Sequence, residues 1–249
     1  MPVAVKILHE SFQHDLEFCR RFYVEALSAS RLDHKNLVRV LDFGQEPDGL
    51  LYFAMDYVDG TPLSRRMEPG VPAPLPWIVD VMCQVCAGLA HAHQRGIVHR
   101  DVKPDNVLLV SAQDDDERPI ERVKLCDFGI SVQEHDEGGA RTVAGTPLYM
   151  SPEQCRGQPL DGRSDVYACG VMLYELATGR PPFEGDVATV LDAHVRAAPP
   201  PPRARVPDLD PALEAIIVKA LAKDASARHG GALALRAELR ALLEAAEPA

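Results

Sequence analysis

The feature that most constrains the fold is a change of pattern near residue 58. Before it, the sequence predicts a strand over 3–8, a helix over 15–31, and two further strands, "LVRVLDFG" and "LLYFAMDYV", joined by the turn "GQEPDG". After it, only short strands are expected, at 107–110 and 122–126, and helices are predicted over 77–95, 162–179, 186–197, 211–222 and 231–246. Strands followed by helices indicate an α+β fold. We therefore expect a small antiparallel β lobe with one helix over 1–58 and a larger, mainly helical lobe over 59–249.

Charge and hydropathy narrow the class of protein. The formal net charge of −11 argues against a nucleic-acid-binding protein, which would carry a basic stripe. The sequence has no run of the roughly 18 apolar residues that a membrane span requires, so no membrane segment is expected. The N-terminus lacks the basic start, apolar run and cleavage site of a signal peptide. These observations predict a cytoplasmic location.

The six cysteines are spread along the chain and lie mostly in apolar surroundings, which fits reduced, buried thiols. Cys83 and Cys86 form the one suggestive pair. No second pair and no histidine pair follow at zinc spacing, and both cysteines fall on one face of a predicted helix. We interpret them as core residues rather than as a metal or redox site.

Two segments lack regular patterning. The stretch "SAQDDDERPIER" (111–122) is predicted to be an acidic surface loop between two short strands. The stretch "AAPPPPRARVPDLDP" (197–211) is either a stiff connector between helices or a polyproline ligand for an adaptor domain. We favour the connector.

The stretch "HRDVKPDN" (99–106) concentrates chemically useful side chains between a predicted helix and an apolar strand. It holds two carboxylates, a lysine, an arginine and an amide. A surface loop would explain any one of these residues, but it explains the whole set poorly. "CDFG" (126–129) and "GTPLYMSPE" (145–153) follow in the same part of the chain.

Together these motifs resemble the eukaryotic-type serine/threonine protein kinase family, in its bacterial form. His-Arg-Asp-x-x-x-x-Asn occurs at 99–106, Asp-Phe-Gly at 127–129, Ser-Pro-Glu at 151–153 in place of Ala-Pro-Glu, and Val-Ala-Val-Lys at 3–6. Four motifs in the family's order span nearly the whole chain. The resemblance implies a two-lobed kinase fold that uses ATP and Mg²⁺.

The resemblance implies a role for each polar residue of the catalytic stretch. Asp101 would accept the proton of the substrate hydroxyl, and Lys103 would reach the transferred phosphate as a point charge. Asn106 and Asp127 would supply hard oxygen ligands to magnesium. Asp-x-Lys-Pro and Gly-Thr-Pro are similar to the serine/threonine kinases, so the expected partners are proteins with Ser or Thr acceptors.

The lysine of the first strand, Lys6, would bind the nucleotide's α- and β-phosphates. A buried ammonium must be paired, and in the family its partner is a glutamate on the following helix. Glu25 lies among apolar residues in the middle of that helix. Glu17, the alternative, falls in the first turn, so we choose Glu25.

The stretch "FAMDYVDG" resembles the hinge that holds adenine. Met55 would guard the back pocket, and the backbone of Asp56 and Val58 would bond the adenine edge. Ala4 and Leu108 would enclose the ring from the two lobes. A plain core strand is also compatible with this stretch, because the contacts would be backbone ones.

Regulation is implied by Arg100, which precedes the catalytic aspartate. Kinases with that arginine often need a phosphate on the activation segment. Thr142 is the predicted site, with Ser131 as the alternative, and self-phosphorylation on Thr142 is expected. Thr146 would bond the catalytic aspartate and lysine.

Five further residues are expected to support the site. His99 and Phe128 have structural roles within their motifs. Glu153 and Arg228 match a buried ion pair of the family, and Asp165 matches the helix residue that holds the catalytic loop.

The family's Gly-x-Gly-x-x-Gly hairpin, which covers the phosphates, is not found before Lys6. Without it the lysine strand is expected to be an exposed sheet edge. Three readings follow: a kinase with the hairpin encoded upstream, a pseudokinase that binds partners without catalysis, or a small-molecule phosphotransferase. We favour the first and expect weak or no activity from this chain by itself.

Overall fold

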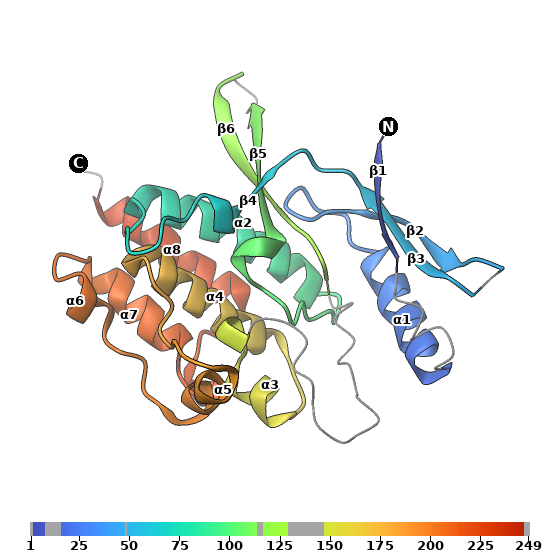
Figure 1. Ribbon diagram of the computed structural model, residues 1–249. Coiled ribbons are helices and arrows are strands. Elements are labelled where there is room, and N and C mark those ends of the chain that lie inside the picture. Colours follow the sequence, from blue (N-terminus) through green and yellow to red (C-terminus); the bar gives the residue numbers. More distant parts are fainter. Residues whose placement is uncertain (1, 8–15, 48, 114–116, 129–146, 247–249) are drawn as a thin grey trace.

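The computed structural model describes residues 2–7, 16–47, 49–113, 117–128 and 147–246. The described chain separates into a small three-stranded sheet with one helix and a larger part dominated by helices (Figure 1). This arrangement confirms the predicted α+β fold with two unequal lobes.

The smaller lobe contains strands β1 (Val3–Ile7), β2 (Val40–Gln45) and β3 (Leu51–Asp56), with helix α1 (Leu16–Ala29) against them. The sheet is antiparallel, in the order β1-β3-β2. Its core is a small apolar cluster in which Phe22 and Ala26 of α1 meet Leu51 and Phe53 of β3. The rings of Phe22 and Phe53 pack edge to face, with their centroids 5.3 Å apart.

Strand β1 forms one edge of this sheet among the described residues. Its apolar side chains are largely in contact with solvent: Val3 is 49%, Val5 53% and Ile7 58% exposed. The expectation of an exposed edge at the lysine strand therefore matches the described part of the structure.

The larger lobe is built around α2 (Leu75–His93), α4 (Gly162–Thr178) and α8 (Ala232–Ala246), whose apolar faces meet in one core. Pro76 lies in the first turn of α2, where a missing N–H costs nothing, so the helix begins two residues earlier than predicted. The remaining helices are α3 (Pro152–Arg156), α5 (Val187–Arg196), α6 (Pro202–Arg205) and α7 (Pro211–Ala220).

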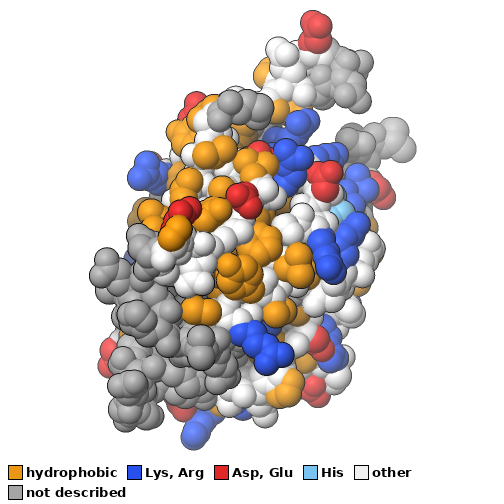
Figure 2. All heavy atoms as spheres, turned by 90° about the vertical axis from the view of Figure 1, so that its right-hand side faces the viewer, with side chains coloured by type: hydrophobic (Ala, Val, Ile, Leu, Met, Phe, Trp, Pro, Cys, Tyr) orange, Lys and Arg blue, Asp and Glu red, His pale blue; other side chains and the backbone are white. Residues whose placement is uncertain are grey.

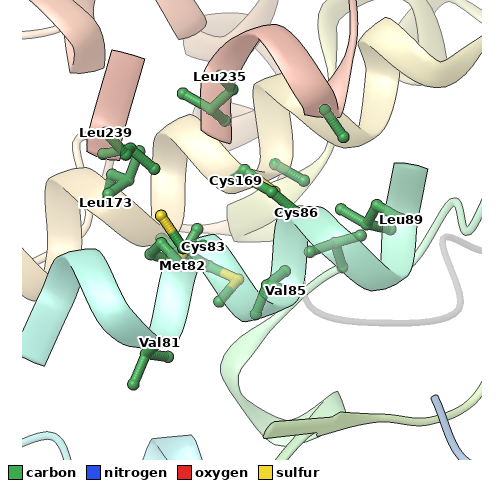
Figure 3. Close-up of a cluster of buried hydrophobic side chains, with 14 of the residues drawn as sticks. Val81, Met82, Cys83, Val85, Cys86, Leu89, Cys169, Leu173, Leu235 and Leu239 are labelled. Carbon is green, nitrogen blue, oxygen red and sulfur yellow. The ribbon is translucent and has the colours of Figure 1, made fainter. Parts of the chain in front are cut away.

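The cysteines of α2 belong to this core. Figure 3 shows Cys86 of α2 facing Cys169 of α4, with Leu235 and Leu239 of α8 close by. None of the six cysteines forms a disulfide, and burial raises the pKa of the Cys83 thiol to about 11. The interpretation of Cys83 and Cys86 as core residues is confirmed.

The same burial explains the apolar character of α2. By length and composition it is the one described helix that could cross a membrane, but 67% of its apolar window is buried inside the protein. A long core helix accounts for this signal.

Residues 111–113 and 119–122 of the loop expected at 111–122 are strand, so that prediction was wrong for these residues. Strands β5 (Val107–Gln113) and β6 (Pro119–Leu125) form an antiparallel hairpin that projects from the larger lobe (Figure 1). Cross-strand pairs continue through Ser111–Glu121 and Ala112–Ile120. Backbone pairing tolerates polar side chains on a solvated strand, so acidic composition did not prevent strand formation. The two-residue strand β4 (Thr61–Pro62) pairs with β5 at its other edge.

The proline-rich stretch 197–211 connects α5 to α7, as favoured. It contains the short helix α6, in which Pro202 is buried. Arg205 of α6 donates from Nη1 to the carbonyl of Pro181 at 2.9 Å. These contacts pack the segment onto the larger lobe and favour the connector over a free polyproline ligand.

The segment before β2 ties the lobes together. Leu32 and Leu37 are buried in the core of the larger lobe. The N–H of Val38 donates to the carbonyl of Leu125, and the N–H of Leu125 to that of Asn36, both at 2.9 Å. A lobe boundary at residue 58 stays a prediction, since these contacts assign part of the preceding chain to the larger core.

Candidate active site

The backbone of the loop that follows α2 is held by the buried carboxylate of Asp165. Asp165, which is 1% exposed on α4, accepts the N–H of His99 at 2.8 Å and that of Arg100 at 2.9 Å. The backbone of Arg100 is left-handed, with φ at 70°. A non-glycine residue adopts this conformation only where its surroundings hold it. Asp165 therefore positions the peptide directly before Asp101.

His99 connects this loop to the segment that carries Asp127. Its ring is fully buried, with Nε2 2.9 Å from the carbonyl of Cys126, and Nδ1 accepts the N–H of Asp101 at 3.2 Å. These partners require a neutral ring with its proton on Nε2. Burial lowers the pKa of His99, which agrees with that tautomer. The ring also contacts Phe128, with the centroids 4.4 Å apart.

Three polar side chains meet at Asp101. Lys103 Nζ lies 2.7 Å from Asp101 Oδ2. The amide of Asn106 donates both to that oxygen, at 2.9 Å, and to the backbone carbonyl of Asp101, at 2.8 Å. The carboxylate is therefore held by two donors on neighbouring turns of one loop.

Lys6 reaches across from the smaller lobe. Its Nζ lies 3.0 Å from Asp127 Oδ1, which brings the first strand and the Asp-Phe-Gly stretch together. Asp127 is also left-handed, with φ at 59°. The expected partner, Glu25, lies on α1, but its side chain is outside the described part of the structure. The pairing of Lys6 with Glu25 stays a prediction.

The expected hinge residues lie where β3 ends. Met55 pairs with Ala4 of β1 and Val40 of β2 across the sheet, and it lines a small cavity of about 20 Å³ together with Phe128. The N–H of Asp56 donates to the carbonyl of Arg39 at 3.0 Å, so a ligand contact at Asp56 would have to use its carbonyl.

The other two residues expected around adenine lie on different elements. Val58 follows β3 and is half-buried, and Leu108 is half-buried on β5. Their contacts with a nucleotide stay predictions.

The donor set suits magnesium. The amide nitrogen of Asn106 is used by Asp101, which leaves its oxygen for a cation, and the backbone bond from Cys126 N–H to Asn106 O places Asn106 beside the residue preceding Asp127. Among the described residues, no cluster of three or more His, Cys, Asp or Glu side chains could hold a metal. Two protein oxygens fit a hard cation that is otherwise held by phosphates and water.

The Ser-Pro-Glu stretch is anchored by an ion pair. Arg228 binds Glu153 through two nearly parallel bonds, Nη1 to Oε1 at 2.7 Å and Nη2 to Oε2 at 2.8 Å. Ser164 donates to the same carboxylate at 2.7 Å. Burial opposes ionisation of Glu153, but the bonds from Arg228 and Ser164 hold its pKa at about 2. The structure thus contains the pair expected from the sequence.

The sequence reasoning missed three supporting residues. His93 Nε2 lies 2.7 Å from Asp165 Oδ2, and Gln154 Nε2 donates to the carbonyl of Arg100 at 2.6 Å. Tyr149 donates to Glu175 at 2.5 Å, at the edge of a cavity of about 840 Å³. Only Gln154 has a sequence signal, because Ser-x-x-Gln at 151–154 predicts the capping box that begins α3.

Thr142 and Thr146, the regulatory threonines expected from the sequence, lie outside the described residues. Their roles stay predictions.

Comparison with known proteins gives matches that cover nearly the whole chain. A family model described as protein kinase domain matches residues 1–239. The chain is 43% identical to serine/threonine-protein kinase pkn3 of Myxococcus xanthus over 249 residues, covering 96% of this chain and 45% of that protein. It is 40% identical to serine/threonine-protein kinase PknB of Mycolicibacterium smegmatis over 254 residues, covering 99% of this chain and 39% of that protein. The chain therefore spans less than half the length of these relatives.

Among solved structures, the crystal structure of the Mycobacterium tuberculosis PknI kinase domain matches with a TM-score of 0.74 and 32% identity. The match covers 96% of this chain and 85% of that domain. The similarity extends over both lobes.

Proposed function

The chain belongs to the protein kinase domain family, and from this premise we propose that it transfers the γ-phosphate of ATP to serine or threonine hydroxyls of proteins. The proposal is supported by the relatives, which are named serine/threonine-protein kinases. The Asp-x-Lys-Pro stretch at 101–104 points to the same acceptor class.

The observation that carries the proposal is the arrangement around Asp101. Its carboxylate is oriented by Lys103 and Asn106, and its backbone is held through Asp165. Asp101 orients the acceptor hydroxyl and takes its proton, and Lys103 stabilises the charge on the transferred phosphate. Phosphoryl transfer asks mostly for positioning and charge stabilisation, so a fixed carboxylate and a nearby ammonium suffice.

Protein kinases use ATP and Mg²⁺, and bound magnesium would neutralise the phosphate oxygens. Asp127 and Asn106 would hold the ion, and Lys6 would bind the phosphates. Lys6 already lies at Asp127, so one ammonium from the smaller lobe and one carboxylate from the larger lobe converge where the phosphates would bind.

The test is incorporation of labelled phosphate from ATP into a Ser/Thr protein, by the wild type and by Asp101→Asn. Loss of the proton acceptor should reduce incorporation about a hundredfold or more. Asp192→Asn, which changes an exposed carboxylate on α5, is the matched control and should leave the rate unchanged. Incorporation by Asp101→Asn equal to a measurable wild-type rate would overturn the role of Asp101. No incorporation above background by the wild type would favour the alternative, a pseudokinase that binds partners without catalysis.

We also propose that this domain works in the cytoplasm in signal transduction and phosphorylates itself on Thr142. Six cysteines that form no disulfide support a reducing compartment.

A further inference from the structure

The chain carries a net charge of −11, yet positive side chains gather around a histidine on one face of the molecule (Figure 2). These positive side chains come from the segment before β2, from β6 and from α8. We call this group the basic patch and define it as Lys35, Arg39, Arg122, Lys124 and Arg236.

The fold brings these residues together through backbone pairing. Arg122 and Lys124 alternate on β6, so their side chains lie on the same face of the strand. The segment that carries Lys35 and Arg39 runs beside the end of β6, because Asn36 and Val38 exchange backbone bonds with Leu125. The side-chain amide of Asn36 also donates to the carbonyl of Val123 at 2.9 Å. Residues far apart in the sequence therefore form one positive surface.

The charges of the patch are poorly compensated. Among the described residues, Lys35, Arg122 and Arg236 have no ion-pair partner. Lys124 donates to the backbone carbonyl of Leu37 at 3.3 Å, and Arg39 Nε lies 3.7 Å from Asp56. Within the described residues, three of the five cations are thus without an ion pair, and a fourth binds only a carbonyl.

The same excess of positive charge affects the pKa of Lys124. Burial lowers the pKa of its ammonium, and Arg122 and Arg39 lower it further, while Asp56 and Asp33 act in the opposite direction. Like charges are therefore held together at some cost to the folded state.

The excess of positive charge in the patch also affects His34. Burial lowers its pKa, and the further lowering comes from His91, Lys35, Arg236 and Lys124, which are all bases. An approaching carboxylate would relieve this repulsion between positive groups.

From this arrangement we propose that the basic patch docks an acidic, carboxylate-rich segment of a protein partner. The patch uses none of the side chains placed around Asp101, so docking leaves the catalytic loop free. The partner is a polypeptide and not a nucleic acid, because a chain of net charge −11 repels a long polyanion beyond the patch, whereas a short acidic segment meets only the local charge.

The experiment measures binding of a fluorescein-labelled peptide of alternating Glu and Gly residues to the Asp101→Asn protein by fluorescence anisotropy. This background removes catalysis, so failure of docking and failure of the proposed kinase activity are separate results. The double variant Lys35→Glu/Arg122→Glu should weaken binding about tenfold or more, and added salt should weaken binding to the unaltered patch. The matched control, Arg196→Glu/Arg203→Glu, changes the same charge on exposed helices of the larger lobe and should bind like the parent protein.

Two comparisons complete the test. A peptide with Gln in place of Glu should not bind, and unchanged thermal unfolding of the patch variant shows that the fold is intact. Equal binding by the patch and control variants overturns the proposal. So does tighter binding of single-stranded RNA than of the acidic peptide.

Discussion

Replacing Arg228 by methionine tests the ion pair that anchors the Ser-Pro-Glu stretch. The Arg228 side chain is fully buried and the Glu153 side chain is 13% exposed. Besides Glu153, Arg228 binds the carbonyls of Ala222 at 2.8 Å, Arg163 at 2.9 Å and Lys223 at 3.2 Å. The substitution leaves a buried carboxylate without its cation and three carbonyls without a donor.

Two lines of reasoning give the same magnitude. Removing one partner of a buried ion pair costs about 3–5 kcal/mol. The pKa of Glu153 falls from 4.5 to about 2 in the folded protein, which corresponds to a stabilisation on the order of 3 kcal/mol at neutral pH. For a chain of this size, such a loss lowers the unfolding midpoint by roughly 10 °C.

The assay is equilibrium unfolding in urea at neutral pH, with Arg163→Met as the matched control. Arg163 forms an exposed ion pair with Asp161, so its loss should cost below about 1 kcal/mol. A loss no larger for Arg228→Met than for the control would refute the reasoning.

The same pair predicts a pH dependence with a definite sign. The folded-state pKa of Glu153 lies below its unfolded value, so its stabilisation is fully present above pH 4.5 and is lost as the pH falls through about 2. The difference in unfolding free energy between the wild type and Glu153→Gln should shrink over that window. A difference that stays constant from neutral pH to about 2 would contradict the assignment.

Three further predictions concern the loop and its surroundings. Asp165→Asn removes the charge that holds the backbone N–H groups before Asp101. We expect kcat to fall about tenfold or more, while KM for ATP stays similar. A change in KM alone would argue for a nucleotide-binding role. Tyr149→Phe leaves half-buried Glu175 without its donor and should cost about 1–3 kcal/mol in urea unfolding, and an unchanged midpoint would show that the bond contributes nothing. Thr142→Ala should lower activity about tenfold or more, with a smaller effect in an Arg100→Ala background; full activity in Thr142→Ala would remove it as the regulatory site.

Much of the site was predictable because its residues are close in sequence. Asp101, Lys103 and Asn106 lie within one loop, so their meeting follows from the spacing itself. Helix positions were also predicted well, since α4 and α7 begin at the expected residues and their apolar periodicity reflects one shared core. The resemblance to kinases supplied the rest, including the pairing of Glu153 with Arg228 across 75 positions.

Prediction failed where backbone pairing or long-range contact decided the outcome. Residues 111–113 and 119–122 of the acidic stretch are strand because β5 and β6 pair with each other, a choice that composition does not encode. His93 was missed as a partner of Asp165 because a histidine near the end of a core helix carries no sign of the carboxylate it meets from another helix.

The sequence by itself determined the fold class and the family and supplied the proposed catalytic side chains, because periodicity and short motifs depend on residues that lie near one another in the chain. Only the tertiary structure decided that His93 contacts Asp165, that Lys6 lies at Asp127, and that scattered lysines and arginines form one basic patch. The physical reason is that these contacts join elements far apart in the chain, and their distances depend on how helices and strands pack rather than on any local pattern.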